Sequence, residues 1–136
     1  MSYLLDTNAL SELFKKNPNP GLVEWISQRP VESLYISVLT LGELRKSVQG
    51  IKDNVHRTKL LDWLETDLPL FFSGRTLTID HFVADRWGNL MFTVGRPLPT
   101  IDSLLAATAL HYGLDLVTRN TKDFDYLNLD VLNPWS

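Results

Sequence analysis

Acidic residues occur where predicted strands end and where predicted helices begin. Asp6 directly follows the apolar run at residues 3–5, and Asp123 lies in a polar segment that follows a later apolar run. Glu43 and Asp102 fall on predicted helices that can face the same region. Carboxylates that converge without a basic partner repel each other unless a cation lies between them. Oxygen ligands select hard cations such as Mg²⁺ or Mn²⁺, and an acidic Mg²⁺ site suits the hydrolysis of a phosphodiester.

Each of these acids also has a purely structural explanation. Asp6 could cap the helix that follows it, and an acid such as Asp102 is favoured in a first helical turn by the exposed N–H groups there. Glu43 lies off the apolar stripe of its helix, which is typical of a solvated residue. Asp123 could be a turn residue. Taken singly, none of the four indicates a site.

The elements that must position these acids follow from the hydrophobic pattern. We predict strands at residues 3–5, 34–37, 75–79, 114–118 and 131–132, and helices at 9–16, 20–29, 38–48, 53–66, 80–94 and 101–112. Thr100 is the expected cap of the last helix and Gly113 its C-terminal stop. Short apolar strands that alternate with helices predict a parallel sheet covered on both faces, whose ligand site lies beyond the carboxyl ends of the strands.

The helix predicted over residues 101–112 carries small side chains on one face. Leu105, Ala106 and Ala109 share the face of Asp102 at a spacing of three to four residues. Their small average size would let this helix pack closely on the sheet. That packing would bring Asp102 toward Asp6.

The composition is that of a globular protein. The chain has 136 residues, 44% apolar and 21% charged, with a net charge of −3 and no cysteine, which excludes disulfides and thiolate metal sites. Neither a signal peptide nor a long apolar span is evident. We predict one domain over residues 1–136, cytoplasmic and without membrane contact. A basic cluster between Arg45 and Lys59 is either a solvated helical face or a rim that contacts phosphates.

Several motifs together resemble a known family. They read LLDTNALSE at 4–12, SVLTLGEL at 37–44, PTIDSLLAATAL at 99–110, LVTRNTKDF at 116–124 and NPW at 133–135. The sequence is similar to PIN-domain ribonucleases, specifically VapC-type toxins of type II toxin–antitoxin pairs, including the FitB-like branch. The resemblance covers essentially the whole chain. It implies a three-layer α/β/α sandwich around a mainly parallel sheet of about five strands, and a metal-dependent endoribonuclease.

The resemblance also implies which residues form the site. Asp6, Glu43 and Asp102 match the family's first three acidic positions, which together hold Mg²⁺ or Mn²⁺. The fourth acid of the family matches Asn120 in some relatives and Asp123 in others. Asn120 brings no charge, so one bound metal and two bound metals both remain open.

Other residues are expected to support the acids or to contact RNA. Thr7, Asn8 and Thr118 match polar positions that orient the acids by hydrogen bonding, as Asn120 could also do. The candidates for RNA contact are Arg119, Arg45 and Lys46. Glu12 lies nearly two helical turns from Asp6 and is expected at the surface or facing a partner.

The partners are likewise implied by the resemblance. Family members form homodimers and bind a small VapB-like antitoxin whose tail blocks the acidic cleft, and they reach operator DNA only through that antitoxin. Leu13, Phe14 and Trp25 could line the antitoxin groove or pack in the core. Two other hypotheses remain: a catalytically weak PIN-fold protein that acts through its antitoxin, and a phosphotransfer enzyme with an aspartate nucleophile.

Overall fold

A five-stranded parallel sheet forms the centre of the protein, in the strand order β3-β2-β1-β4-β5. The computed structural model describes residues 1–126 and 128–136. The strands are β1 (Tyr3–Leu5), β2 (Leu34–Ser37), β3 (Thr76–Leu77), β4 (Asp115–Val117) and β5 (Val131–Leu132). The central position of β1 places the residue that follows it, Asp6, in the middle of the sheet's carboxyl edge.

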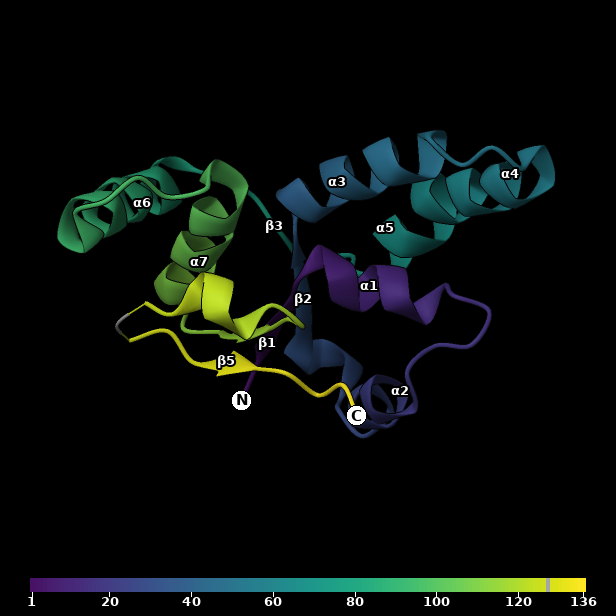
Figure 1. Ribbon diagram of the computed structural model, residues 1–136, viewed down its shortest axis with the longest axis horizontal. Helices are drawn as coiled ribbons and strands as arrows, with labels where there is room; N and C mark the ends of the chain where they lie inside the picture. Colours follow the sequence, from purple (N-terminus) through teal and green to yellow (C-terminus); the bar gives the residue numbers. More distant parts are fainter. Residues whose placement is uncertain (127) are drawn as a thin grey trace.

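The helices cover both faces of this sheet (Figure 1). They are α1 (Thr7–Leu13), α2 (Pro20–Ser27), α3 (Val38–Gln49), α4 (Asn54–Asp62), α5 (Leu68–Phe71), α6 (His81–Val94) and α7 (Thr100–Tyr112). Short turns are η1 (Val31–Ser33), η2 (Trp63–Asp67) and η3 (Thr121–Phe124). The predicted fold class, an α/β/α sandwich around a parallel sheet, is therefore confirmed. Among the described helices, none has the length and apolar character needed to cross a bilayer.

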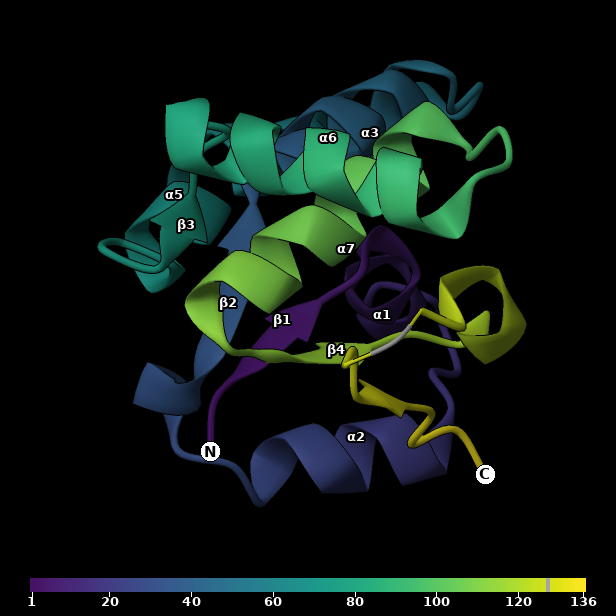
Figure 2. The same cartoon turned by 90° about the vertical axis from the view of Figure 1, so that its left-hand side faces the viewer.

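The alternation of side chains along β1 divides the core into two clusters. Tyr3 and Leu5 point to one face, where they meet buried residues of α1, α2 and α3. Leu4 points to the other face and packs against α7 and Leu116 of β4. Figure 2 shows α7 along one face of the strands and α2 against the other. All three side chains of β1 are buried, as a strand covered on both sides requires.

Helix α7 lies close to the sheet because its inward face is small. Ala106 and Ala109 are fully buried, and Leu105 is nearly so, in the cluster that contains Leu4. This arrangement confirms the packing predicted from their spacing. The helix ends at Gly113, whose left-handed backbone (φ 65°) terminates it as expected.

Several predicted boundaries were wrong for identifiable reasons. The helix predicted over 53–66 ends at Asp62 and continues as the π-helical turn η2 and then α5. Pro69 cannot donate a backbone hydrogen bond, so the preceding turn widens. Thr100 lies inside α7, whose N-cap is Pro99. The strand predicted at 75–79 is only two residues long, at the sheet edge.

Candidate active site

Asp6 is fixed at the carboxyl edge by two hydrogen bonds. Leu5 and Val117 are paired residues of β1 and β4, so the residues that follow them lie side by side. The Thr7 backbone N–H donates to Asp6 Oδ1 at 2.7 Å, and the Thr118 hydroxyl donates to Asp6 Oδ2 at 2.8 Å. Asp6 is thus the N-cap of α1, as the structural explanation proposed, while its second oxygen is held by β4.

The Thr118 hydroxyl connects three segments of the chain. It donates to Asp6 and accepts from Asn8 Nδ2 at 3.2 Å and from the Asn120 backbone N–H at 3.1 Å. The Arg119 backbone N–H in turn donates to Asn8 Oδ1 at 3.4 Å. This network ties the start of α1 to the loop after β4 and holds the Asp6 carboxylate in one orientation.

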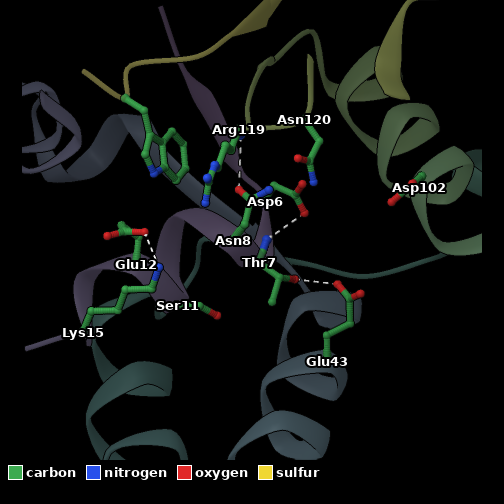
Figure 3. A pocket seen from close by; sticks show the side chains of 11 residues that line it. Asp6, Thr7, Asn8, Ser11, Glu12, Lys15, Glu43, Asp102, Arg119 and Asn120 are labelled. Atoms are coloured by element: carbon green, nitrogen blue, oxygen red, sulfur yellow. Dashed lines mark hydrogen bonds and ion pairs between the residues drawn. The ribbon is translucent and has the colours of Figure 1, made fainter. Parts of the chain in front are cut away.

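Glu43 reaches the same region from α3. The Thr7 hydroxyl donates to Glu43 Oε1 at 2.5 Å (Figure 3). The Thr40 hydroxyl lies 3.2 Å from that of Thr7. Glu43 is half-buried, so the solvated-surface explanation does not describe its position. Thr7 therefore links two of the predicted acids, through its backbone to Asp6 and through its side chain to Glu43.

Burial and neighbouring carboxylates raise the pKa of both Asp6 and Asp102. Burial raises the pKa of Asp6, and the nearby charges of Glu43 and Asp102 raise it further, while the hydrogen bonds from Thr118 and Thr7 lower it. The pKa of Asp102 is also raised, first by burial and then by the charges of Asp123 and Glu43. These groups therefore share one electrostatic environment in which a cation would favour ionisation.

The acids surround a cavity of about 340 Å³. Its lining residues are Asp6, Thr7, Asn8, Ser11, Glu12, Lys15, Glu43, Asp102, Arg119, Asn120 and Trp135. Three of the predicted acids are thus brought together around one space. Asp123 is exposed in η3 and is not part of the lining, whereas Asn120 is.

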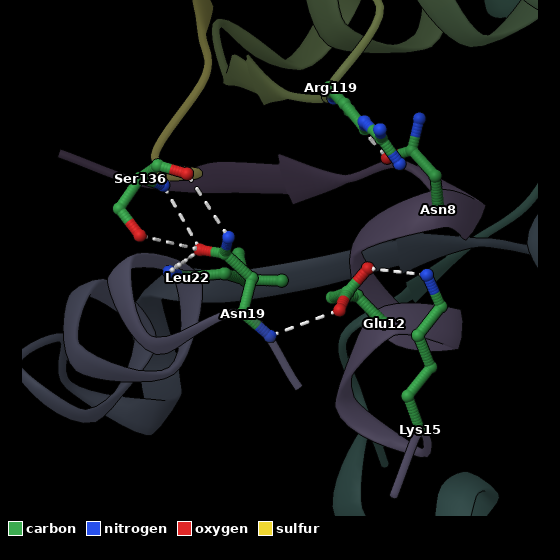
Figure 4. Close-up of polar contacts among 7 residues, drawn as sticks. All are labelled: Asn8, Glu12, Lys15, Asn19, Leu22, Arg119 and Ser136. Carbon is green, nitrogen blue, oxygen red and sulfur yellow. Dashed lines mark hydrogen bonds and ion pairs between the residues drawn. The ribbon is translucent and has the colours of Figure 1, made fainter. Parts of the chain in front are cut away.

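The prediction that Glu12 lies at the surface or faces a partner was wrong. Glu12 is 7% exposed and lines the cavity. Glu12 Oε1 lies 2.9 Å from Lys15 Nζ, and Oε2 accepts from the Asn19 backbone N–H at 3.0 Å (Figure 4). Asn8 and Glu12 lie four residues apart on one face of α1, and this spacing is the sequence signal that could have placed Glu12 near Asp6.

Asn19 connects this part of the cavity to the C-terminal segment. Its side-chain Oδ1 accepts from the backbone N–H of Leu22, as the N-cap of α2, and from that of Ser136, at 3.2 and 3.0 Å. Its Nδ2 donates to Ser136 O at 3.2 Å. Ser136 follows Trp135, so these bonds hold in place a segment that contributes to the cavity wall.

The basic residues predicted to contact RNA lie in different places. Arg119 is exposed and lines the cavity. Arg45 pairs with Glu65 at 2.9 Å, and Lys46 is exposed on α3; neither lines the cavity. Of the three, only Arg119 is positioned beside the acids.

The donor set fits a hydrated divalent cation. Among residues 1–126 and 128–136, no three His, Cys, Asp or Glu side chains already lie close enough to enclose a metal ion. Mg²⁺ keeps several waters and is commonly held by only one or two carboxylates, so it does not need a complete shell of protein ligands. Asp6 and Asp102 lie on an open cavity, and their pKa values are raised by burial and then by like charges, so the pair meets that requirement.

The comparison with known proteins places this chain in a family. The PIN domain model matches residues 3–128. The VapC ribonuclease Y4jK of Sinorhizobium fredii is 34% identical over 135 residues, covering 97% of this chain and 96% of that protein. Toxin FitB of Neisseria gonorrhoeae is 33% identical, covering 97% of each.

Solved structures agree with this result. The crystal structure of FitAcB from Neisseria gonorrhoeae has a TM-score of 0.89 and 33% identity, covering 98% of both chains. The structure of VapBC-1 from nontypeable Haemophilus influenzae has a TM-score of 0.71 and 26% identity, with 98% of both chains covered. The chain belongs to the PIN-domain family, on the branch that contains VapC ribonucleases and FitB toxins.

Proposed function

We propose that this protein is a Mg²⁺-dependent endoribonuclease that acts as the toxin of a VapBC-type toxin–antitoxin pair. The observation that carries the proposal is the placement of Asp6. Its carboxylate is fixed at the carboxyl end of the central strand by Thr7 and Thr118, and it shares a cavity with Glu43 and Asp102. Relatives of similar length named as ribonucleases and toxins support the same function.

Asp6 and Asp102 are the residues that would hold the metal, with Mn²⁺ as a substitute for Mg²⁺. A bound Mg²⁺ supplies two effects, a lower pKa of coordinated water and neutralisation of charge on the phosphate oxygens. Thr7 and Thr118 each direct a donor to Asp6, so the carboxylate does not rotate away from the cavity.

Glu43 is the candidate general base or further metal ligand. The Thr7 hydroxyl at 2.5 Å holds one of its oxygens and leaves the other available to accept a proton from the attacking water. Asn120 would orient a water or coordinate through its carbonyl oxygen. Asp123, outside the cavity lining, would act through its charge on Asp102.

An antitoxin is the proposed partner, because the similar structures include a toxin–antitoxin complex and the FitAB complex bound to DNA. Its proposed docking surface is an apolar cavity of about 280 Å³ that includes Leu13, Phe14 and Trp63. Trp25 packs edge-on against Tyr3 and is better assigned to the core. Homodimerisation, and contact with operator DNA only through the antitoxin, complete the proposal.

The test is RNA cleavage by purified protein that is free of antitoxin. Total RNA is incubated with Mg²⁺, Mn²⁺ or EDTA, beside Asp6→Asn, Asp102→Asn and the control Asp85→Asn, an exposed acid on α6. We expect cleavage only with metal, unchanged in the control and reduced by roughly 100-fold or more in the site variants, since even residues that only orient metal ligands change activity 10–100-fold.

Three other results would each contradict a part of the proposal. Cleavage that persists equally in both site variants would refute the assignment of Asp6 and Asp102. Metal binding without cleavage of any RNA would indicate a binding protein that acts through its antitoxin. Release of phosphate from a small phosphomonoester would indicate a phosphotransfer enzyme.

A further inference from the structure

The cavity has two chemically different ends. Asp102 and Glu43 lie at one end, Glu12 and Lys15 at the other, and Asp6 lies between them (Figure 3). The proposed chemistry uses the acidic end and assigns no role to the Glu12–Lys15 end. That end carries an ammonium group, which is a natural partner for a phosphate.

Lys15 is held at the cavity by a buried carboxylate. Its Nζ lies 2.9 Å from Glu12 Oε1, while the Asn19 backbone N–H donates to the other carboxylate oxygen of Glu12. The hydrogen bond from Lys15 lowers the pKa of Glu12, which keeps this carboxylate ionised. The Glu12 side chain is 9% exposed, whereas 58% of the Lys15 side chain is open to solvent.

The ammonium of Lys15 retains binding capacity in this arrangement. A lysine ammonium has three donors, and Glu12 Oε1 occupies one of them. Because Glu12 already restricts the side chain, less conformational entropy is lost when a ligand binds than for a free surface lysine. Lys15 is therefore a preorganised cation on the cavity wall, with donors directed to solvent.

The distance between the two ends matches more than one phosphate. Asn8 lies in the first turn of α1 (Thr7–Leu13), and Lys15 lies just past the end of this helix, whose seven residues span about 10 Å at 1.5 Å per residue. Asn8 is hydrogen-bonded into the network around Asp6, so Lys15 lies well beyond the reacting position. A nucleic-acid strand, which carries successive phosphates, can contact both ends at once.

We infer that Lys15, positioned by Glu12, binds a backbone phosphate of the RNA next to the phosphodiester that is cleaved. Arg119, between the two ends in Figure 3, lies along the same path. The inference rests on the proposed function and adds to it the route of the substrate strand along α1. It also explains why a cavity built for hydrolysis includes an ion pair remote from the acids.

The test is the binding of a fluorescein-labelled single-stranded RNA, measured by anisotropy at several KCl concentrations in EDTA, where cleavage is not supported. Wild type is compared with Lys15→Gln and with the matched control Lys16→Gln, which removes the same charge one residue away and outside this cavity. One phosphate contact changes the logarithmic salt slope by about 0.7 for a single strand, equivalent to about 5-fold in affinity at 0.1 M salt.

We expect Lys15→Gln to raise Kd about 5-fold and to reduce the salt slope by about 0.7, Lys16→Gln to change neither, and Lys15→Arg to restore both. Equal losses in Lys15→Gln and Lys16→Gln would overturn the inference in favour of a long-range charge effect. A lower Tm with unchanged Kd would overturn it in favour of a structural ion pair. If wild type neither binds nor cleaves RNA, the proposed function itself fails, which the other outcomes do not imply.

Discussion

Replacing Thr118 with valine tests the network that fixes Asp6. The side chain is fully buried, and valine keeps its shape but removes the hydroxyl. The hydrogen bond to the ionised Asp6 carboxylate at 2.8 Å is the main loss, worth about 1.5–3 kcal/mol for a charged partner. The Asn8 amide and the Asn120 N–H also lose an acceptor, but both residues reach solvent and can bond to water. We therefore expect Thr118→Val to lower the free energy of unfolding by about 2–3 kcal/mol.

The matched control is Thr118→Ser, which keeps the hydroxyl and loses a buried methyl group worth about 1 kcal/mol. Both variants are unfolded in urea at pH 7 in EDTA, and the comparison is valid if the m-value is unchanged. The Thr118 hydrogen bond lowers the pKa of Asp6, so the valine variant's deficit should shrink at acidic pH, where Asp6 is protonated. If Thr118→Val is as stable as Thr118→Ser, the hydroxyl does not hold Asp6 and the reasoning is refuted.

Three further predictions concern stability. The pKa of Asp102 is raised by burial and by neighbouring acids, so the metal-free protein loses stability as pH rises through that pKa. Asp102→Asn should therefore raise Tm at pH 8 in EDTA. The substitution should have no effect at about pH 3, where the carboxyl is neutral in the folded and unfolded states. A Cβ at Gly21 would lie 2.7 Å from the Ser136 backbone N. Gly21→Ala should therefore destabilise the protein by about 1–3 kcal/mol and speed hydrogen exchange of the Ser136 amide. Unchanged exchange would contradict this contact. Gly88 lies within α6 with open space at its Cβ position. Gly88→Ala should therefore stabilise the protein by about 0.5–1 kcal/mol, measured by urea unfolding. A loss of stability would show that this space is filled.

The positions of the central acids could be predicted because each depends on a local pattern. Asp6 follows a short apolar strand, and parallel pairing of β1 with β4 places it beside Thr118. Asp102 lies on the small-residue face that lets α7 approach the sheet. In each case the strand or helix period and the direction of the chain are sufficient to specify the edge of the sheet.

The surroundings of Glu12 and Asn120 could not be predicted in this way. Glu12 is buried because the loop after α1 returns to present the Asn19 N–H, and that path is set by packing between distant segments. Asn120 lines the cavity because its N–H bonds to Thr118, while Asp123 falls in the following 3-10 turn, outside the lining. Asn120 and Asp123 are three residues apart in one loop, and hydrophobic periodicity does not show which of them lines the cavity.

The pairing of β1 with β4 has a consequence for when the protein becomes functional during synthesis. Asp6 and Thr118 are 112 positions apart, and closing a loop of that length costs about 4 kcal/mol of chain entropy before any contact compensates. Asp6 is among the first residues to be made, yet its carboxylate has no fixed orientation until β4 pairs with β1. A nascent chain that ends before Thr118 therefore carries Asp6 without the contact that orients its carboxylate, and the central strand of the sheet is completed late in folding.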